Sequence, residues 1–237
     1  HFEEALQRFK AIEKFPQSKA YPYGLYKSAW CYYNLKKTDE GIKQLITVIN
    51  DNPSTSSDQK KYNLRKEALR DLTLFAGEVL PPEKLYSFFE KITTKDELGE
   101  AIISLASLYE SHSKFKEITI FVQKFINENP QSPLTIKCYA KLIETNETLK
   151  QRESVIALMK KMGEVCQSNN ITSNNEPSDK TCQEQFRSVN LEISKKWWEI
   201  WLKNKNNLEF SKLTEQAFEI LLKYDDITQP DSKSRFA

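Results

Sequence analysis

Apolar residues recur every three or four positions along most of the chain. Residues 21–36 and 39–51 show the pattern most clearly, and a short polar break separates them. This spacing places apolar side chains on one face of a helix. Pro53 then ends the second helix, because its ring fixes φ and removes a hydrogen-bond donor. The stretch therefore predicts a helix, a tight turn and a second helix.

The same pattern returns along the rest of the chain, and it predicts about five helix pairs after a leading half-repeat. The other expected copies cover residues 2–15, 64–92, 98–130, 132–147 with 151–167, and 182–205 with 207–225. Thr94, with Glu97 three residues later, predicts a capping box at a helix start. Residues 167–181 have no helical periodicity and almost no apolar side chain, so we expect a flexible loop there.

The order of small and large residues in the first complete hairpin resembles a tetratricopeptide (TPR) repeat. Ala29 and Gly41 stand where the two helices must approach closely. Four bulky residues would fill the space between them: Leu25, Tyr32, Leu45 and Val48. The interval from Ala5 to Gly41 is close to the TPR period of about 34 residues. Residues 98–130 repeat this order, although Ile118 replaces the small residue that is usual in the second helix.

The resemblance implies an all-α fold, a right-handed TPR-like α-solenoid of antiparallel helix pairs that spans residues 1–237 as a single fragment. In such an array each pair covers the apolar face of its neighbour. The last helix carries no polar capping face, so we expect the natural protein to continue in both directions. Residues 64–72 and 195–198 are also similar to long TPR proteins of the cell envelope and gliding machinery of gram-negative bacteria. That similarity implies a bacterial, non-enzymatic adaptor in a multiprotein assembly.

In TPR proteins the first helices of the pairs line a concave face that binds partners. Carried over onto this chain, the resemblance places Asn34 and four aromatic residues on that face: Tyr23, Tyr26, Trp30 and Tyr33. Large rigid rings with a polar group are common at binding hot spots. Arg70, Lys137 and Lys141 extend the expected partner-binding face. The alternatives are that some rings pack against the preceding helix and that the charges form an ordinary solvated face.

We therefore expect a scaffold that binds a peptide segment or a small folded protein in a concave groove. The alternative is a structural cell-envelope or motility assembly protein that acts through self-association or lateral stacking. The sequence does not fix the compartment, and the similarity to envelope proteins slightly favours the envelope or periplasm over the cytoplasm.

Charge and hydropathy argue against two classes of partner. Lys and Arg number 35 and Asp and Glu number 33, which leaves a net charge of +2. Such a balance provides no broad basic surface for nucleic acid. No apolar run approaches the roughly 20 residues of a membrane-spanning helix, so we expect no direct insertion into a membrane.

No arrangement of residues in the sequence predicts catalysis, a metal site or a cofactor. The chain has two histidines, and we expect His112 to lie at a helix end, as a cation or a C-cap. The four cysteines lack the close paired spacing of a zinc site. We expect Cys31 and Cys138 to be small buried residues.

Two further cysteines and a group of tryptophans each leave two interpretations open. Cys166 and Cys182 flank the loop of residues 167–181. A disulfide between them would close a loop of about 17 residues and contribute roughly 3 kcal/mol in an oxidising compartment. Free thiols are the alternative. Three tryptophans farther along form an exposed docking patch or fill the junction between repeats: Trp197, Trp198 and Trp201.

Overall fold

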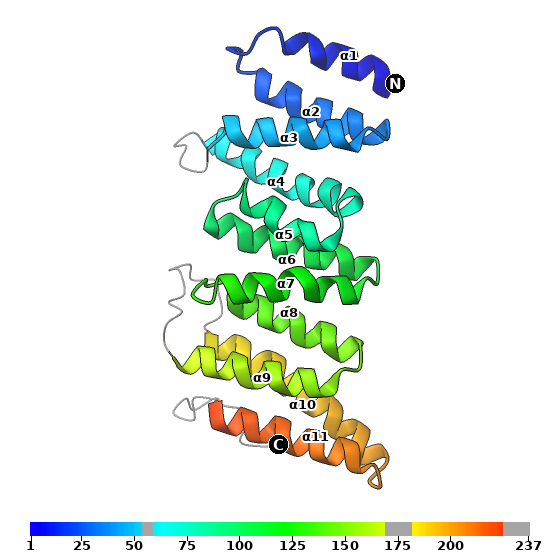
Figure 1. The fold of residues 1–237 in the computed structure, drawn as a ribbon, viewed down its shortest axis with the longest axis vertical. Helices are drawn as coiled ribbons and strands as arrows, with labels where there is room; N and C mark the ends of the chain where they lie inside the picture. Colours follow the sequence, from blue (N-terminus) through cyan, green and yellow to red (C-terminus); the bar gives the residue numbers. More distant parts are fainter. Residues whose placement is uncertain (54–58, 169–181, 225–237) are drawn as a thin grey trace. The chain divides into compact units, whose positions relative to one another are not determined.

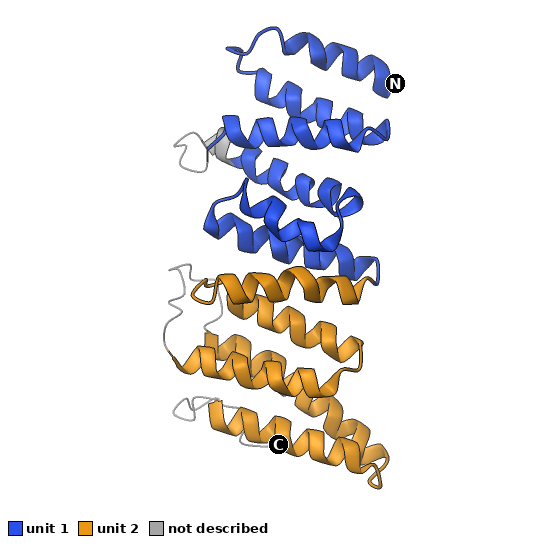
Figure 2. Ribbon diagram, in the orientation of Figure 1, with its two compact units in different colours: residues 1–113 blue, residues 114–237 orange. Residues whose placement is uncertain are grey.

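The computed structural model describes residues 1–53, 59–168 and 182–224, and all regular structure in these ranges is α-helical (Figure 1). The predicted all-α fold is therefore confirmed. Consecutive helices pack against each other within two compact units, residues 1–113 and residues 114–237 (Figure 2). We call these unit 1 and unit 2 and describe each by itself. The single right-handed solenoid stays a prediction.

Unit 1 contains six helices among its described residues, and each packs against the next within the unit. They are α1 (Phe2–Ile12), α2 (Tyr21–Asn34), α3 (Thr38–Asp51), α4 (Gln59–Val79), α5 (Pro82–Glu90) and α6 (Lys95–Ser111). Helix α4 also contacts α2 and α6. The predicted capping box at the start of α6 is confirmed, because Thr94 and Glu97 bond each other's backbone N–H groups. His112 is the C-cap of the same helix, as expected.

The predicted close approach around Gly41 is also confirmed. A Cβ atom added there would lie 2.9 Å from Cε2 of Phe75 and 3.0 Å from the carbonyl oxygen of Ala29. Real Cβ atoms essentially never come that near to a ring carbon. Glycine at this position therefore lets α3 pack tightly against both α2 and α4.

Unit 2 contains five helices among its described residues. They are α7 (Phe115–Glu128), α8 (Thr135–Thr148), α9 (Arg152–Gln167), α10 (Cys182–Lys203) and α11 (Leu208–Tyr224). Helix α10 contacts α8, α9 and α11. Its apolar residues point in several directions, and three neighbours cover much of that surface. Trp197 is completely buried among them.

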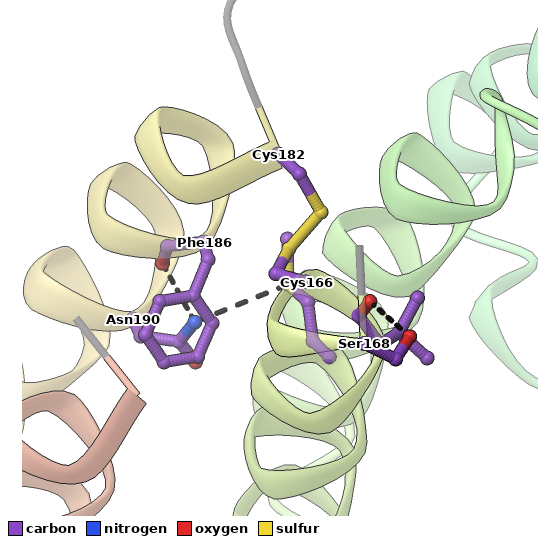
Figure 3. The surroundings of a disulfide bond; sticks show 7 residues. Cys166, Ser168, Cys182, Phe186 and Asn190 are labelled. Atoms are coloured by element: carbon purple, nitrogen blue, oxygen red, sulfur yellow. Dashed lines mark hydrogen bonds between the residues drawn. A yellow bond between two sulfur atoms is a disulfide. The ribbon is translucent and has the colours of Figure 1, made fainter. Parts of the chain in front are cut away.

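A covalent bond links α9 to α10. The sulfur atoms of Cys166 and Cys182 form a disulfide with an S–S distance of 2.04 Å and a Cα–Cα distance of 5.5 Å (Figure 3). Cys166 is buried near the end of α9, and Cys182 is the first residue of α10. Most of the loop expected over 167–181 lies outside the described residues. Cys31 and Cys138 are buried, as predicted, and neither forms a disulfide.

One turn occurs in both units in the same form. Lys36 follows α2 with φ 61° and Lys150 follows α8 with φ 59°, both in the left-handed region. At each turn two backbone N–H groups bond the carbonyls of the preceding helix end, in the pattern of a Schellman motif. The chain has only five glycines, and lysine takes the position that glycine usually fills. The shared turn supports internal repetition of a helix–turn–helix element.

Candidate protein-binding surface on α2 and α4

Two aromatic side chains of α2 converge on one buried carboxylate of α4. The Tyr26 hydroxyl and the Trp30 indole N–H donate to Oδ2 of Asp71, at 2.6 and 2.7 Å. The side chain of Asp71 is only 8% exposed. A carboxylate out of water is stable only when donors satisfy it. The two bonds therefore hold the Tyr26 and Trp30 side chains in fixed orientations against α4.

Tyr33, one turn farther along α2, is held in a similar way. Its ring stacks on Phe75 of α4, with centroids 4.4 Å apart and an interplanar angle of 14°. Its hydroxyl donates to Oε1 of Glu78 at 2.6 Å. Trp30 meets the same Phe75 ring edge-on, with centroids 5.3 Å apart. Phe75 thus contacts the rings of two predicted binding residues, Trp30 and Tyr33.

These contacts raise the pKa of both phenols above the ordinary tyrosine value of 10.0. Burial, followed by the hydrogen bond to Asp71, raises the pKa of Tyr26 to about 12. The hydrogen bond to Glu78, followed by burial, raises the pKa of Tyr33 to about 12. Both hydroxyls therefore act as donors to carboxylates across the physiological range.

The residues that remain accessible form what we call the aromatic surface: Tyr23, Trp30, Tyr33, Asn34 and Arg70. Tyr23 is 45% exposed and Trp30 and Tyr33 are half-buried, while the Arg70 side chain is 71% exposed. Arg70 Nε lies 3.6 Å from Oδ1 of Asp71. The side-chain amide of Asn34 donates to the Trp30 carbonyl at 2.8 Å. Trp30 lies seven residues after Tyr23, and Tyr33 and Asn34 lie three and four residues after Trp30. These spacings place the four α2 side chains on one side of the helix.

The expectation that Tyr26 belongs to an open binding face is wrong. Tyr26 is 8% exposed, because its hydroxyl reaches inward to Asp71. The sequence did hold a signal for this contact. Asp71 falls on the apolar stripe of α4, three residues after Ala68 and four before Phe75. A carboxylate in such a stripe requires a donor from a neighbouring helix. Phe75, which contacts Trp30 and Tyr33, was not predicted as a member of the site.

Lys137 and Lys141 lie on α8 and belong to unit 2, whereas the aromatic surface belongs to unit 1. Lys137 is half-buried, and Nζ of Lys141 pairs with Oε2 of Glu144 at 3.1 Å. We therefore treat the two lysines as a separate set.

The sequence left open whether the tryptophans of α10 form an exposed patch or fill the interior, and the structure shows one of each kind. Trp197 fills the interior of unit 2 and donates from Nε1 to Oε2 of Glu147 at 3.0 Å. Trp198 is 38% exposed, and Trp201 is half-buried. One ring is thus part of the packing, and the next along the chain faces solvent.

Residues 1–53, 59–168 and 182–224 contain no group of three or more His, Cys, Asp or Glu side chains placed to hold a metal ion. None of the helices in those ranges has both the length and the apolar character needed to span a bilayer.

Comparison with known proteins adds no family to this picture. No family model matches the chain, and no curated protein matches it. Its likeness to helical repeat proteins therefore rests on eleven described helices that pack in neighbouring pairs.

Proposed function

We propose that this chain is a non-enzymatic scaffold that binds a peptide segment or a small folded protein through the aromatic surface of unit 1. The observation that carries the proposal is that contacts with α4 hold two partly exposed rings in fixed orientations. Trp30 and Tyr33 each combine a solvent-accessible part with a hydrogen bond to a carboxylate and a contact to Phe75.

Fixed ring orientations favour binding for a physical reason. A side chain that is already ordered loses little conformational entropy when a partner contacts it. Tyrosine and tryptophan also offer a large contact area together with a polar group. Asn34 bonds the Trp30 carbonyl, Arg70 lies beside the Asp71 that holds Trp30, and both are exposed, so they can supply the polar and charged rim that protein interfaces commonly have. The concave groove of a TPR array is part of this proposal.

A peptide-library selection followed by quantitative binding tests the proposal. Peptides selected on the wild-type protein from a random displayed library are titrated against a Tyr23→Ala/Tyr33→Ala variant. We expect these peptides to bind the variant at least about tenfold more weakly, because truncated hot-spot residues typically cost more than 1 kcal/mol each.

Phe15→Ala is the matched control, because Phe15 is an aromatic residue of unit 1 that is 65% exposed and lies outside the aromatic surface. It should bind the selected peptides as the wild type does. Circular dichroism should show the same helix content for all three proteins. Equal affinities of the double variant and the wild type would exclude the aromatic surface as the binding site.

A further inference from the structure

Unit 2 contains an open groove between α10 and α11. It has a volume of about 270 Å³ and is lined by six residues: Trp198, Trp201, Ser211, Thr214, Glu215 and Phe218. Three of these side chains are aromatic and two carry hydroxyl groups. Glu215 is the charged member of the lining and is itself exposed. The groove thus combines aromatic walls with a single negative charge.

Thr214 forms part of the groove lining through its side chain. It is 8% exposed, and its Oγ1 atom is buried without a hydrogen-bond partner among the described residues. Because this oxygen is closed to solvent, it offers no contact to a ligand in the groove.

The tryptophan rings of the groove also differ from other rings of unit 2. The face of Phe210 is occupied by the guanidinium of Arg152, whose Cζ lies 4.6 Å from the ring centroid. Within the described part of the chain, Trp198 and Trp201 have no cation over their rings. Tryptophan is the aromatic side chain that attracts cations most strongly.

We propose that this groove binds a basic side chain, lysine or arginine, of a partner peptide. The cationic head would lie against the rings of Trp198 and Trp201 and pair with the Glu215 carboxylate. An acidic side chain would be repelled by Glu215. An apolar side chain would form no ion pair with the carboxylate. The groove is independent of the aromatic surface in unit 1.

Nuclear magnetic resonance with three capped tripeptides tests this assignment. The probes are acetyl-Gly-Xaa-Gly-amide with lysine, norleucine or glutamate at the centre, so the cation is the main difference between the first two. Each is titrated into ¹⁵N-labelled protein, and the indole N–H signals of Trp198 and Trp201 are followed. We expect saturable shifts with the lysine probe and weaker or no shifts with the other two. Norleucine binding as tightly as lysine, or no saturable shift with lysine, overturns the proposal.

Matched variants assign the effect to individual groups. Glu215→Gln should weaken the lysine probe by up to about fivefold, as expected for one exposed ion pair. Glu219→Gln neutralises an exposed acid of α11 outside the groove lining and should leave binding unchanged. Equal affinity of the Glu215 and Glu219 variants would contradict the assignment. A Tyr23→Ala/Tyr33→Ala protein should bind the lysine probe normally, which separates this result from the test of unit 1.

Discussion

Units 1 and 2 connect their helices by different means. In unit 1 the guanidinium of Arg65 on α4 binds both oxygens of Glu97 in the first turn of α6, at 2.6 and 2.8 Å, and the carbonyls of Ile49 and Asn52 at the end of α3. In unit 2 the disulfide between Cys166 and Cys182 joins α9 to α10. Each device ties the end of one hairpin to the next helix.

This difference indicates which interaction the stability of each unit depends on. The Arg65 side chain is 8% exposed, so its contacts are little screened by water. We therefore expect the stability of unit 1 to depend on this charge pair and to decrease in acid. Unit 2 depends on a covalent bond whose presence follows the redox potential of the compartment. Two units built from the same kind of helical packing should thus respond to different conditions, one to acid and the other to reduction. Four changes that alter stability test the comparison.

The largest effect should follow from Arg65→Met. The substitution keeps an apolar side chain of similar length but leaves the Glu97 carboxylate and two buried carbonyls without their donor. Removing one partner of a buried pair costs about 3–5 kcal/mol, and we expect a loss of that size in the free energy of unfolding of unit 1. Urea unfolding gives the total, and hydrogen exchange assigns it to helices α3 to α6.

Arg70→Met is the control for this measurement. The Arg70 side chain is 71% exposed, so its loss should change stability by less than about 0.5 kcal/mol. Equal losses from the two substitutions, or equal loss of protection in unit 2, would show that the buried pair is not what distinguishes unit 1.

Reduction of the disulfide should have the next largest effect. Its cysteines are 16 residues apart, and a loop of this length corresponds to about 3 kcal/mol. Dithiothreitol should therefore lower the stability of unit 2 and leave the amide protection of unit 1 unchanged. The same reagent should have no effect on a Cys166→Ser/Cys182→Ser protein. Four reactive thiols in the denatured, unreduced chain would show that no bridge had formed.

One glycine in each unit allows the tightness of helix packing in the two units to be compared. A Cβ at Gly163 of unit 2 would lie 2.5 Å from Cγ and 2.8 Å from Cβ of Tyr224, near the root of that side chain. A Cβ at Gly77 of unit 1 would lie 2.9 Å from Cδ2 of Leu108, a flexible end. Gly163→Ala should destabilise the protein by about 1–3 kcal/mol, reduced by the better helix propensity of alanine.

Gly77→Ala should cost less than Gly163→Ala, because Leu108 can turn away. Thermal unfolding of the two variants in parallel measures the difference. A larger loss at Gly77 would mean that backbone spacing is tighter in unit 1 than in unit 2.

The smallest effect concerns acid. Burial raises the pKa of Glu97, but the hydrogen bonds and charge of Arg65 together with the bonds to Thr94 outweigh it, so the pKa lies below the usual 4.5. A lowered pKa in the folded state stabilises the fold above pH 4.5, and this contribution is lost as pH falls through the folded-state value. Unit 1 should therefore lose stability below pH 4.5 more steeply in the wild type than in Glu97→Gln. Parallel slopes in urea titrations between the two proteins would contradict this account.

Much of the helical layout could be predicted from spacing alone. Regular apolar spacing located the helices, Thr94 and Glu97 gave one helix start, and Gly41 marked a close approach. These features are local, because each depends on residues within one or two turns of the same helix or on the size of one side chain.

The candidate site was harder to predict because α2 is covered on several sides. It packs against α1, α3 and α4, and seven of its fourteen residues are buried. Periodicity identifies a buried face but not which neighbour covers it, so Tyr26 was assigned to the open side. The carboxylate of Asp71, 45 residues away, decides its orientation. Arg65 was missed for the same reason, since its partners come from α3 and from the first turn of α6.

The cross-link between α9 and α10 has a consequence for proteolysis. Any single cut in the main chain between positions 166 and 182 leaves the two fragments joined through sulfur. A nicked chain would migrate as one band on a non-reducing gel and as two bands after reduction. Cleavage in this segment therefore does not by itself separate α10 and α11 from the helices that precede them.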